Sequence, residues 1–382
     1  MHIELTDRQK EHQARFHAFV QSEVAPHADQ FDQEERISPE VVSQMAHHGY
    51  LGSVVPAAED GTSTDMITFG ILNEELGRGC SSVRSLLTVH SMVAHTIFKW
   101  GTQEHKRLWL PQLVSGEIIG AFALSEPNIG SDAKNVETTA TLENDQYVLQ
   151  GRKKWITFAQ IAHLFIIFAQ CDGKVSAVLV ERSTPGLTID PIYGVLGTRA
   201  SMLGELHLNN CRIPKKNLIG GLGFGLSAIA TSALDIGRYS VACGSVGIAQ
   251  ACLDASLAYT SERKQFGTYL RDHQLIQQMI TDMVTNVRAA RLLCYQAGYL
   301  KDAGDPETIM TTWVAKYFAS VAANKAALDA VQIHGANGCS AHYPVQRYLR
   351  DAKVMEIIEG SSQIQQINIA RHSYKARTPH IS

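Results

Sequence analysis

Among the residues of this sequence, Glu359 has the strongest case for doing chemistry, because it lies at a break between two predicted helices. Residues 348–358 alternate apolar and charged side chains, and Gly360 then ends that helix, since glycine tolerates the left-handed conformation. A second helix can begin at Ser362, because Ser362-x-x-Gln365 has the form of a capping box. A carboxylate held at such a break loses solvation, which raises its pKa and makes it a candidate general base. The alternative is a solvated glutamate at a helix end.

Length and composition indicate a globular chain of two or three domains. The 382 residues are 45% apolar and 19% charged, and the net charge of -3 gives no reason to expect nucleic acid or an anionic membrane as partner. No unbroken apolar run reaches the roughly 20 residues that span a bilayer, and the N-terminal residues resemble neither a signal nor a transit peptide. The seven cysteines are dispersed without a Cys-x-x-Cys, so we expect reduced thiols in a cytoplasmic protein.

Three regions of different character must position Glu359. Residues 1–118 show helical periodicity and predict an N-terminal all-α domain. Residues 119–222 contain short β-branched runs separated by turn residues, which predict a central antiparallel β-barrel or sandwich. Residues 223–382 contain long, apolar-striped helices with short connections, which predict a C-terminal four-helix bundle. The predicted fold class is therefore α+β and multidomain.

Motifs for metal or nucleotide binding are missing from the sequence. The histidines at 47, 48, 90 and 95 have no partner at a spacing such as His-Glu-x-x-His, so we expect no metal site. The glycines from Gly220 to Gly225 do not fit Gly-x-Gly-x-x-Gly and follow no buried parallel strand, so they predict a flexible junction.

Four ordered stretches resemble signatures of the acyl-CoA dehydrogenase family. They are Ala121-Phe-Ala-Leu-Ser-Glu-Pro-Asn-Ile-Gly-Ser-Asp132; Lys154-Trp-Ile-Thr157; Glu262-Arg-Lys-Gln-Phe-Gly267 with His273-Gln274; and Gln332-Ile-His-Gly335 with Arg347-Tyr-Leu-Arg-Asp351 and Glu359-Gly-Ser361. The resemblance covers residues 120–372. It implies that family's fold, oxidation of acyl thioesters, and FAD bound without a Rossmann motif.

The resemblance also implies two sets of FAD contacts. One set would lie along the isoalloxazine ring, and the other would reach the FAD of a neighbouring subunit, which implies a homodimer or homotetramer. The ring contacts would be Phe122, Leu124, Ser125, Trp155 and Thr157, with Ser361 and Gln363 as further contacts; the neighbouring-subunit contacts would be Arg263, Phe266, Gln274, Gln332 and Gly335. An arginine suits a pyrophosphate because its planar fork donates in pairs. The alternatives are a core role for Trp155 and a surface ion pair for Arg263.

Glu359 matches the family's catalytic base in its Glu-Gly-Thr/Ser motif. The α-proton of a thioester is weakly acidic, so a carboxylate must face it while a hydride leaves the β-carbon for the flavin. Some relatives carry the base one position before the arginine of the first bundle helix, and here that position is Gly237, which cannot act. The expected substrate-binding residues are Ser131, Asp235, Arg238 and Gly360. We expect Glu356, one turn before the base, to pair with Lys353 or Arg350.

Three departures from the family pattern predict an unusual substrate pocket. Phe158-Ala159 stands where the family often has Asn-Gly, Gly335-Ala336 stands where it often has Gly-Gly, and Ile358 stands where it often has an aromatic residue.

A narrower resemblance is to a biosynthetic branch of the family, and it is carried by residues 234–242, 272–283, 334–339 and 355–360. Its members oxidise small acyl groups on an acyl carrier protein, making hydroxymalonyl or methoxymalonyl extender units for polyketide antibiotics. The expected substrate is then a carrier-bound small acyl thioester.

Other functions stay open at this level. The chain could be a catabolic short- or branched-chain acyl-CoA dehydrogenase that makes a 2-enoyl-CoA and reduces electron-transfer flavoprotein. A flavin-binding scaffold without catalysis and a flavin monooxygenase of the same fold are further alternatives. The sequence leaves undecided the acyl group, the carrier, the electron acceptor, the number of subunits, and whether the base takes its proton from carbon or oxygen.

Overall fold

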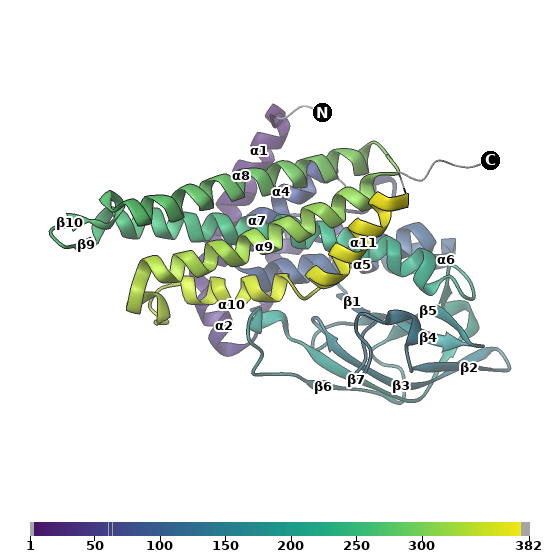
Figure 1. Ribbon diagram of the computed structural model, residues 1–382. Helices are drawn as coiled ribbons and strands as arrows, with labels where there is room; N and C mark the ends of the chain where they lie inside the picture. Colours follow the sequence, from purple (N-terminus) through teal and green to yellow (C-terminus); the bar gives the residue numbers. More distant parts are fainter. Residues whose placement is uncertain (1–3, 60, 63, 376–382) are drawn as a thin grey trace.

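A helical body carries a β domain along one side (Figure 1). The computed structural model describes residues 4–59, 61–62 and 64–375. The helices that precede the β domain are α1 (Asp7–Phe19), α2 (Ala28–Glu34), α3 (Pro39–His47), α4 (Met66–Gly79), α5 (Ser81–Trp100) and α6 (Gln103–Val114). Helix α4 begins where the Asp65 side chain accepts the Thr68 backbone N–H, which satisfies one of the unpaired donors of the first turn. Helix α5 is buried along almost its whole length.

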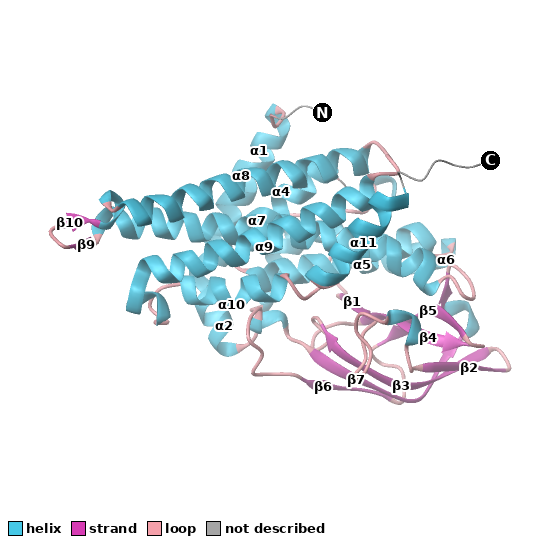
Figure 2. Cartoon of the chain, in the orientation of Figure 1, coloured by secondary structure: helices cyan, strands magenta, loops and turns pink. Residues whose placement is uncertain are grey.

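The β domain is a single mixed sheet that lies on one side of the helical body in Figure 2 and shares an apolar core with α5 and α6. Its strands are β1 (Gly120–Ala123), β2 (Thr139–Glu143), β3 (Gln146–Ile156), β4 (Leu164–Cys171), β5 (Lys174–Glu181), β6 (Leu187–Pro191), β7 (Gly204–Pro214) and β8 (Leu218–Ile219). Their order is β6-β7-β3-β2-β4-β5-β8, with β1 beside β4. The predicted central β domain is confirmed, but the β1–β4 and β2–β4 pairings are parallel rather than antiparallel. The β2–β3 hairpin lies within the β1–β4 connection, which makes it long enough for a parallel pair.

The C-terminal part returns to helices, as predicted. They are α7 (Thr231–Glu262), α8 (Gln274–Asp302), α9 (Thr308–His334), α10 (Val345–Met355) and α11 (Ser362–Lys375), with a small hairpin of β9 (Lys264–Gln265) and β10 (Thr268–Tyr269) beyond the end of α7. One apolar core joins Phe69 and Leu72 of α4 to Val246 of α7 and Ala323 of α9. Since the N-terminal helices share this core with the bundle, the domain boundaries at 118/119 and 222/223 stay a prediction.

The stretch Gly225–Glu262 is long and apolar enough to cross a membrane by length and composition alone. The sequence did not suggest this, because Asp235 and Arg238 interrupt its apolar pattern. In the structure 72% of its most apolar window is buried among the other elements, so we interpret it as the central helix of the core.

Candidate active site

The backbone between α10 and α11 turns sharply at Glu359. Glu359 has φ of 56° and Gly360 has φ of 88°, so two consecutive residues adopt left-handed conformations. Such a conformation costs free energy in a non-glycine residue and persists only where the surroundings enforce it. The predicted capping box at Ser362 is wrong: the hydroxyl of Ser361 accepts the Ile364 N–H, while the Gln365 side chain donates to the carbonyls of residues 359 and 360.

Side chains from three helices hold this turn through its backbone carbonyls. The Glu359 carbonyl accepts from Arg238 Nε of α7 and from Gln365 Nε2 of α11, each at 3.1 Å. The Gly360 carbonyl accepts from Lys316 Nζ of α9 at 2.8 Å and from Gln365 Nε2 at 3.0 Å. These contacts explain how the strained backbone at residue 359 is maintained, and they fix where its side chain begins.

The Glu359 carboxylate lies against α7 at a glycine. Its Oε2 atom is buried and has no hydrogen-bond partner among the described residues, although Glu359 as a whole is only partly buried. A Cβ added to Gly237 would overlap Oε2 and would lie 2.9 Å from the Met92 sulfur of α5. Position 237 thus faces the carboxylate that the sequence singled out. Glycine there leaves the space that Glu359 occupies.

Burial raises the pKa of Glu359 to about 7, while the positive charges of Arg238, Lys316 and Arg84 hold it lower than burial alone would. A carboxyl group with a pKa near the working pH is both substantially ionised and basic enough to accept a proton. The geometry and this pKa agree with the predicted role of Glu359 as general base, which stays a prediction.

Two cations near the base were not predicted from the sequence, Arg84 and Lys316. Both side chains are fully buried, and neither has a carboxylate within ion-pair distance among the described residues. The sequence contained a signal for each cation. Arg84 is a charged residue inside the mostly buried helix Ser81–Trp100, and Lys316 is a charged residue inside the alanine-rich helix Thr308–His334. A buried charge is costly, so such a residue is retained for a reason.

Arg84 lies across α7 beside the end of α10. It donates from Nη1 to Thr88 Oγ1 at 2.8 Å and from Nη2 to the Met355 sulfur at 3.5 Å, while Nε is buried without a partner. A Cβ added to Gly244 would overlap the Arg84 side chain, so glycine is required where Arg84 crosses α7. Burial lowers the pKa of Arg84 to about 10, so the group stays charged at neutral pH.

The residues expected along the flavin ring lie on β1, on β3 and in the loops that follow them. Trp155 has φ of 63° and its side chain is 51% exposed, so it is not a core aromatic. Phe122 and Leu124 are partly exposed as well, Ser125 donates to the Lys154 carbonyl, and Thr157 follows β3. An exposed aromatic held in a strained conformation fits a face that stacks a flat, apolar ring.

A buried ion pair fixes the loop that carries this face. Lys153 Nζ lies 2.6 Å from Glu126 Oε1 and also donates to the Leu124 carbonyl at 3.2 Å. Glu126 in turn accepts the backbone N–H of Thr138. Both ionic side chains are almost completely buried, so the loop from β1 is tied to β3 from within the domain.

The residues expected to reach a neighbouring FAD lie at the opposite end of the molecule (Figure 1). Arg263 caps the end of α7 just before the β9–β10 hairpin, Phe266 lies in the turn of that hairpin, and the Phe266 side chain is 96% exposed. Tyr259 stacks on His334 with ring centroids 4.2 Å apart, which joins the end of α7 to the end of α9. Gln274, Gln332 and Gly335 are exposed at this same end. A single chain therefore does not bring together the residues expected along the flavin ring and those expected to reach a neighbouring FAD. A flavin site that uses both sets needs a second copy of the chain.

The expected substrate residues and the remaining flavin residues have different surroundings. Asp235 forms an ion pair with Lys301 and leaves its Oδ1 buried without a partner. Arg238 contacts the backbone of the base, as described above, and Gly360 offers its carbonyl to protein side chains. Ser131 is exposed in the loop after β1, and Gln363 is exposed in the first turn of α11. The binding roles of these residues stay predictions.

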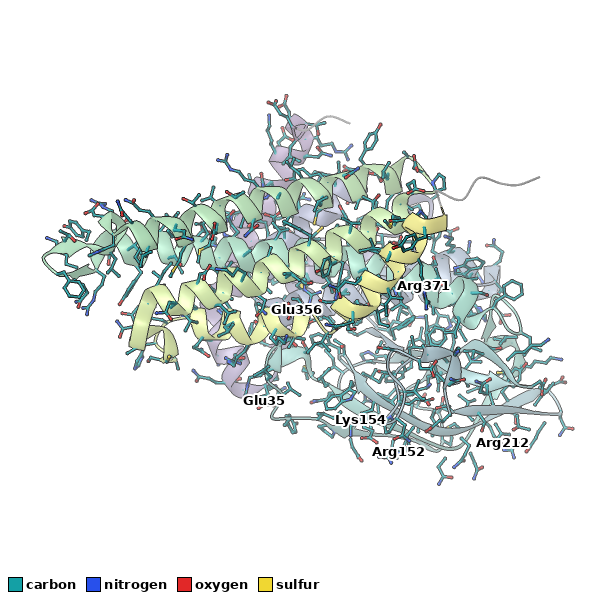
Figure 3. The ribbon with its side chains drawn as sticks, viewed as in Figure 1. Glu35, Arg152, Lys154, Arg212, Glu356 and Arg371 are labelled. Carbon is teal, nitrogen blue, oxygen red and sulfur yellow. The ribbon has the colours of Figure 1, made fainter. Side chains whose placement is uncertain are left out.

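Glu356, labelled in Figure 3 just beyond the end of α10, behaves as the sequence indicated. Its carboxylate forms an ion pair with Lys353 at 2.6 Å and accepts from Asn324 Nδ2 at 3.3 Å. This pairing separates it from Glu359, whose Oε2 has no such partner.

Comparison with known proteins identifies the class of protein that this fold and site define. The chain matches the profiles of the acyl-CoA dehydrogenase N-terminal domain over residues 6–117, middle domain over 121–211 and C-terminal domain over 223–374. The chain belongs to the acyl-CoA dehydrogenase family.

Individual relatives agree with that assignment over nearly the whole chain. The mitochondrial short-chain specific acyl-CoA dehydrogenase of Rattus norvegicus is 40% identical, covering 93% of this chain and 87% of the relative. The solved glutaryl-coenzyme A dehydrogenase in complex with glutaryl-CoA is 36% identical, with a TM-score of 0.94 over 99% of this chain and 98% of the other. FkbI, described as serving biosynthesis of the methoxymalonyl extender unit of the Fk520 polyketide, is 31% identical, with a TM-score of 0.87 over 95% and 99%.

The chain is thus an oxidoreductase that acts on acyl thioesters and uses FAD, and its residues fit that cofactor. The exposed Trp155 face would support the flavin ring, and Arg263 has no ion-pair partner among the described residues, which leaves its guanidinium free for a pyrophosphate.

We expect Arg263→Ala to weaken FAD binding roughly 10- to 100-fold, because a hydrogen bond to a charged group contributes about 1.5–3 kcal/mol. The measurement is the FAD retained after dialysis, together with a fluorescence titration of the apoprotein. Arg212→Ala is the matched control, since this arginine lies on the β domain and pairs with Glu143 (Figure 3). A variant that keeps all its flavin through dialysis would contradict the assignment.

Proposed function

We propose that this chain is an FAD-dependent dehydrogenase of a small, polar acyl thioester, carried on an acyl carrier protein, in the biosynthesis of a hydroxymalonyl-type extender unit for polyketides. The observation that carries this proposal is the fully buried guanidinium of Arg84, which has no ion pair among the described residues and whose charge acts on Glu359. A hydrocarbon acyl chain has no polar atom that could interact with a guanidinium, whereas an acyl group that bears oxygen at C3 has hydrogen-bond acceptors.

The charged groups around Glu359 support this substrate class. Arg84, Arg238 and Lys316 act on the carboxylate of Glu359, and each of these cations is also influenced by one further carboxylate, that of Asp351, Asp235 or Glu356. Arg84 and Lys316 have no carboxylate within ion-pair distance among the described residues, so their buried charges favour an anion in the site. Oxidation of a 2-hydroxy-3-oxopropionyl thioester, as its hydrate, yields a carboxyl group at C3. The buried charge of Arg84 would favour that group electrostatically as its negative charge develops.

The chain's own groups divide the work of the reaction. Glu359 accepts the proton: from a hydroxyl of the hydrate in the proposed reaction, or from the α-carbon if the substrate is a saturated acyl chain. The backbone N–H groups of Glu359, Gly360 and Ser361 donate to no other group among the described residues, so they are available to a thioester carbonyl. Bound FAD supplies the oxidant, taking the hydride that leaves the substrate.

Two relatives support an acyl group with polar atoms. One is FkbI, whose description names the methoxymalonyl unit, and the other is the dehydrogenase solved with glutaryl-CoA, an acyl group that ends in a carboxylate. The likeness to the short-chain specific enzyme favours a second candidate, a catabolic acyl-CoA dehydrogenase that reduces electron-transfer flavoprotein. Its substrate would be a short saturated acyl-CoA, for which Arg84 has no evident use.

The assembly and location proposed for the enzyme follow from the same features. The separation of the two flavin-binding sets favours a homodimer or homotetramer with sites shared between copies. The cysteines are unpaired, and all except Cys339 are buried, which suits a reducing cytoplasm.

The test is anaerobic bleaching of the flavin absorbance in the purified holoenzyme. Matched panels of butyryl, isobutyryl, 3-hydroxypropionyl and 2-hydroxy-3-oxopropionyl groups are offered on CoA and on acyl carrier protein. The proposal expects rapid bleaching by the oxygenated acyl group on the carrier protein and slow bleaching by the hydrocarbon acyl-CoAs. Rapid turnover of butyryl-CoA or isobutyryl-CoA would favour the catabolic alternative instead.

A further inference from the structure

The side chain of Lys316 crosses from α9 to the turn that carries Glu359. It is completely buried, and its ammonium donates to two backbone carbonyls, Gly360 at 2.8 Å and Glu356 at 3.5 Å. These carbonyls lie on either side of Glu359 in the sequence. Lys316 therefore spans the turn that holds the carboxylate, rather than the carboxylate itself.

The acidic residue that could have paired with Lys316 is engaged elsewhere. The carboxylate of Glu356 binds Lys353 and Asn324, which leaves only its carbonyl for Lys316. A buried ammonium that is hydrogen-bonded only to carbonyls has no carboxylate in direct contact to neutralise its charge in this region of low dielectric. That charge acts on Glu359 more strongly than it would in water.

We propose that Lys316 is the positioning residue of the base: its bridge across the turn holds Glu359 in the left-handed conformation, and its charge keeps the carboxylate ionised at neutral pH. The inference rests on Glu359 as the base, as proposed above. The charged groups that act on Glu359 are Arg84 from α5, Arg238 from α7 and Lys316 from α9. Those that act on Lys316 are Glu356, Glu359 and Arg238.

The electrostatics of the two groups support this arrangement. Burial lowers the pKa of Lys316 to about 8, with Glu359 the strongest influence in the other direction. Burial raises the pKa of Glu359 to about 7, and Lys316 lowers it. Because a nearby cation favours the ionised carboxylate, removal of the Lys316 charge must raise the Glu359 pKa further.

The decisive experiment measures the Glu359 pKa directly in the holoenzyme without substrate. Infrared difference spectra between wild type and Glu359→Gln identify the carboxyl band of Glu359, which is then titrated in Lys316→Met and Lys316→Gln. Methionine removes both the charge and the donor, whereas glutamine removes the charge and keeps a donor for the carbonyls. Lys325→Met is the matched control, since this lysine lies on the same helix and pairs with Asp329 on the surface.

We expect the Glu359 pKa to rise by about one unit or more in both Lys316 variants and to stay unchanged in Lys325→Met. Flavin reduction by the substrate should then fall roughly tenfold near pH 6 in both, because fewer molecules carry an ionised base. At high pH the glutamine variant should approach the wild-type rate, while the methionine variant stays slower because the turn has lost its bridge.

Different results separate the two ideas. An unchanged Glu359 pKa in a folded Lys316 variant overturns the inference. If Lys316→Met does not fold, the Glu359 pKa is measured in Lys316→Gln alone. Retained flavin reduction in Glu359→Gln would instead overturn the base assignment, whatever the Lys316 variants show.

Discussion

Glu359→Gln should fold and retain FAD while its rate of flavin reduction by the substrate falls about 10²- to 10⁴-fold, the usual contribution of a general base. Glutamine has nearly the same shape, so the fit against Gly237 and Met92 is preserved. Its amide cannot accept the proton, and it also removes the negative charge on which Arg84, Arg238 and Lys316 all act. The measurement is single-turnover reduction of the flavin in a stopped-flow instrument.

Glu104→Gln serves as control, because this glutamate is exposed on α6 and pairs with Lys216 far along the chain from the base. In the wild type the rate should rise with pH through about 7 and level off above it, since only the ionised carboxylate accepts a proton. A Glu359→Gln variant with near-wild-type reduction, or a wild-type rate that does not respond to pH between about 6 and 8, would count against Glu359 as the base.

The helix break at Glu359 could be predicted from the sequence because its signal is local. A charged pattern that ends at a glycine indicates such a break, and the structure places Glu359 there, although the predicted capping box at Ser362 is absent. The long helices could be predicted for a similar reason, since their periodicity is a property of consecutive residues. Sequence periodicity also predicted the β domain, but not its parallel pairings, which depend on which strands meet.

What the sequence could not provide is the convergence of distant residues on the base. Arg84, Arg238 and Lys316 come from three helices, and only Arg238 was singled out by a motif. The fit of Gly237 against the Glu359 carboxylate and of Gly244 against Arg84 depends on how α5, α7 and the α10–α11 turn cross. Helical periodicity indicates which face of a helix is buried, but it does not identify the residue on the facing helix. The positions of the charges that shift the Glu359 pKa therefore could not be predicted from the sequence and follow only from the three-dimensional structure.

Arg84→Leu should separate the two candidate functions. Reduction of the flavin by the oxygenated acyl group should fall about 150- to 5000-fold, because loss of one partner of a desolvated charge pair costs roughly 3–5 kcal/mol. Reduction by a short saturated acyl-CoA should change little when it is measured well above pH 7, where Glu359 stays ionised even without the Arg84 charge. The measurement compares the two substrates by stopped flow in the same preparation of the holoenzyme.

The fold should survive this substitution. Arg84 is buried without a carboxylate partner among the described residues, so leucine removes an uncompensated charge and fills part of its volume with apolar atoms. Replacement of a buried charged group by an apolar one of similar size is often neutral or stabilising. The thermal midpoint should therefore stay the same or rise, which distinguishes a loss of recognition from a loss of structure. Arg84→Lys keeps the charge but not the planar fork, so its activity should fall between wild type and leucine. An equal loss with both substrates would mean that Arg84 acts through the Glu359 pKa rather than on the acyl group, and the polar substrate would lose its main structural support.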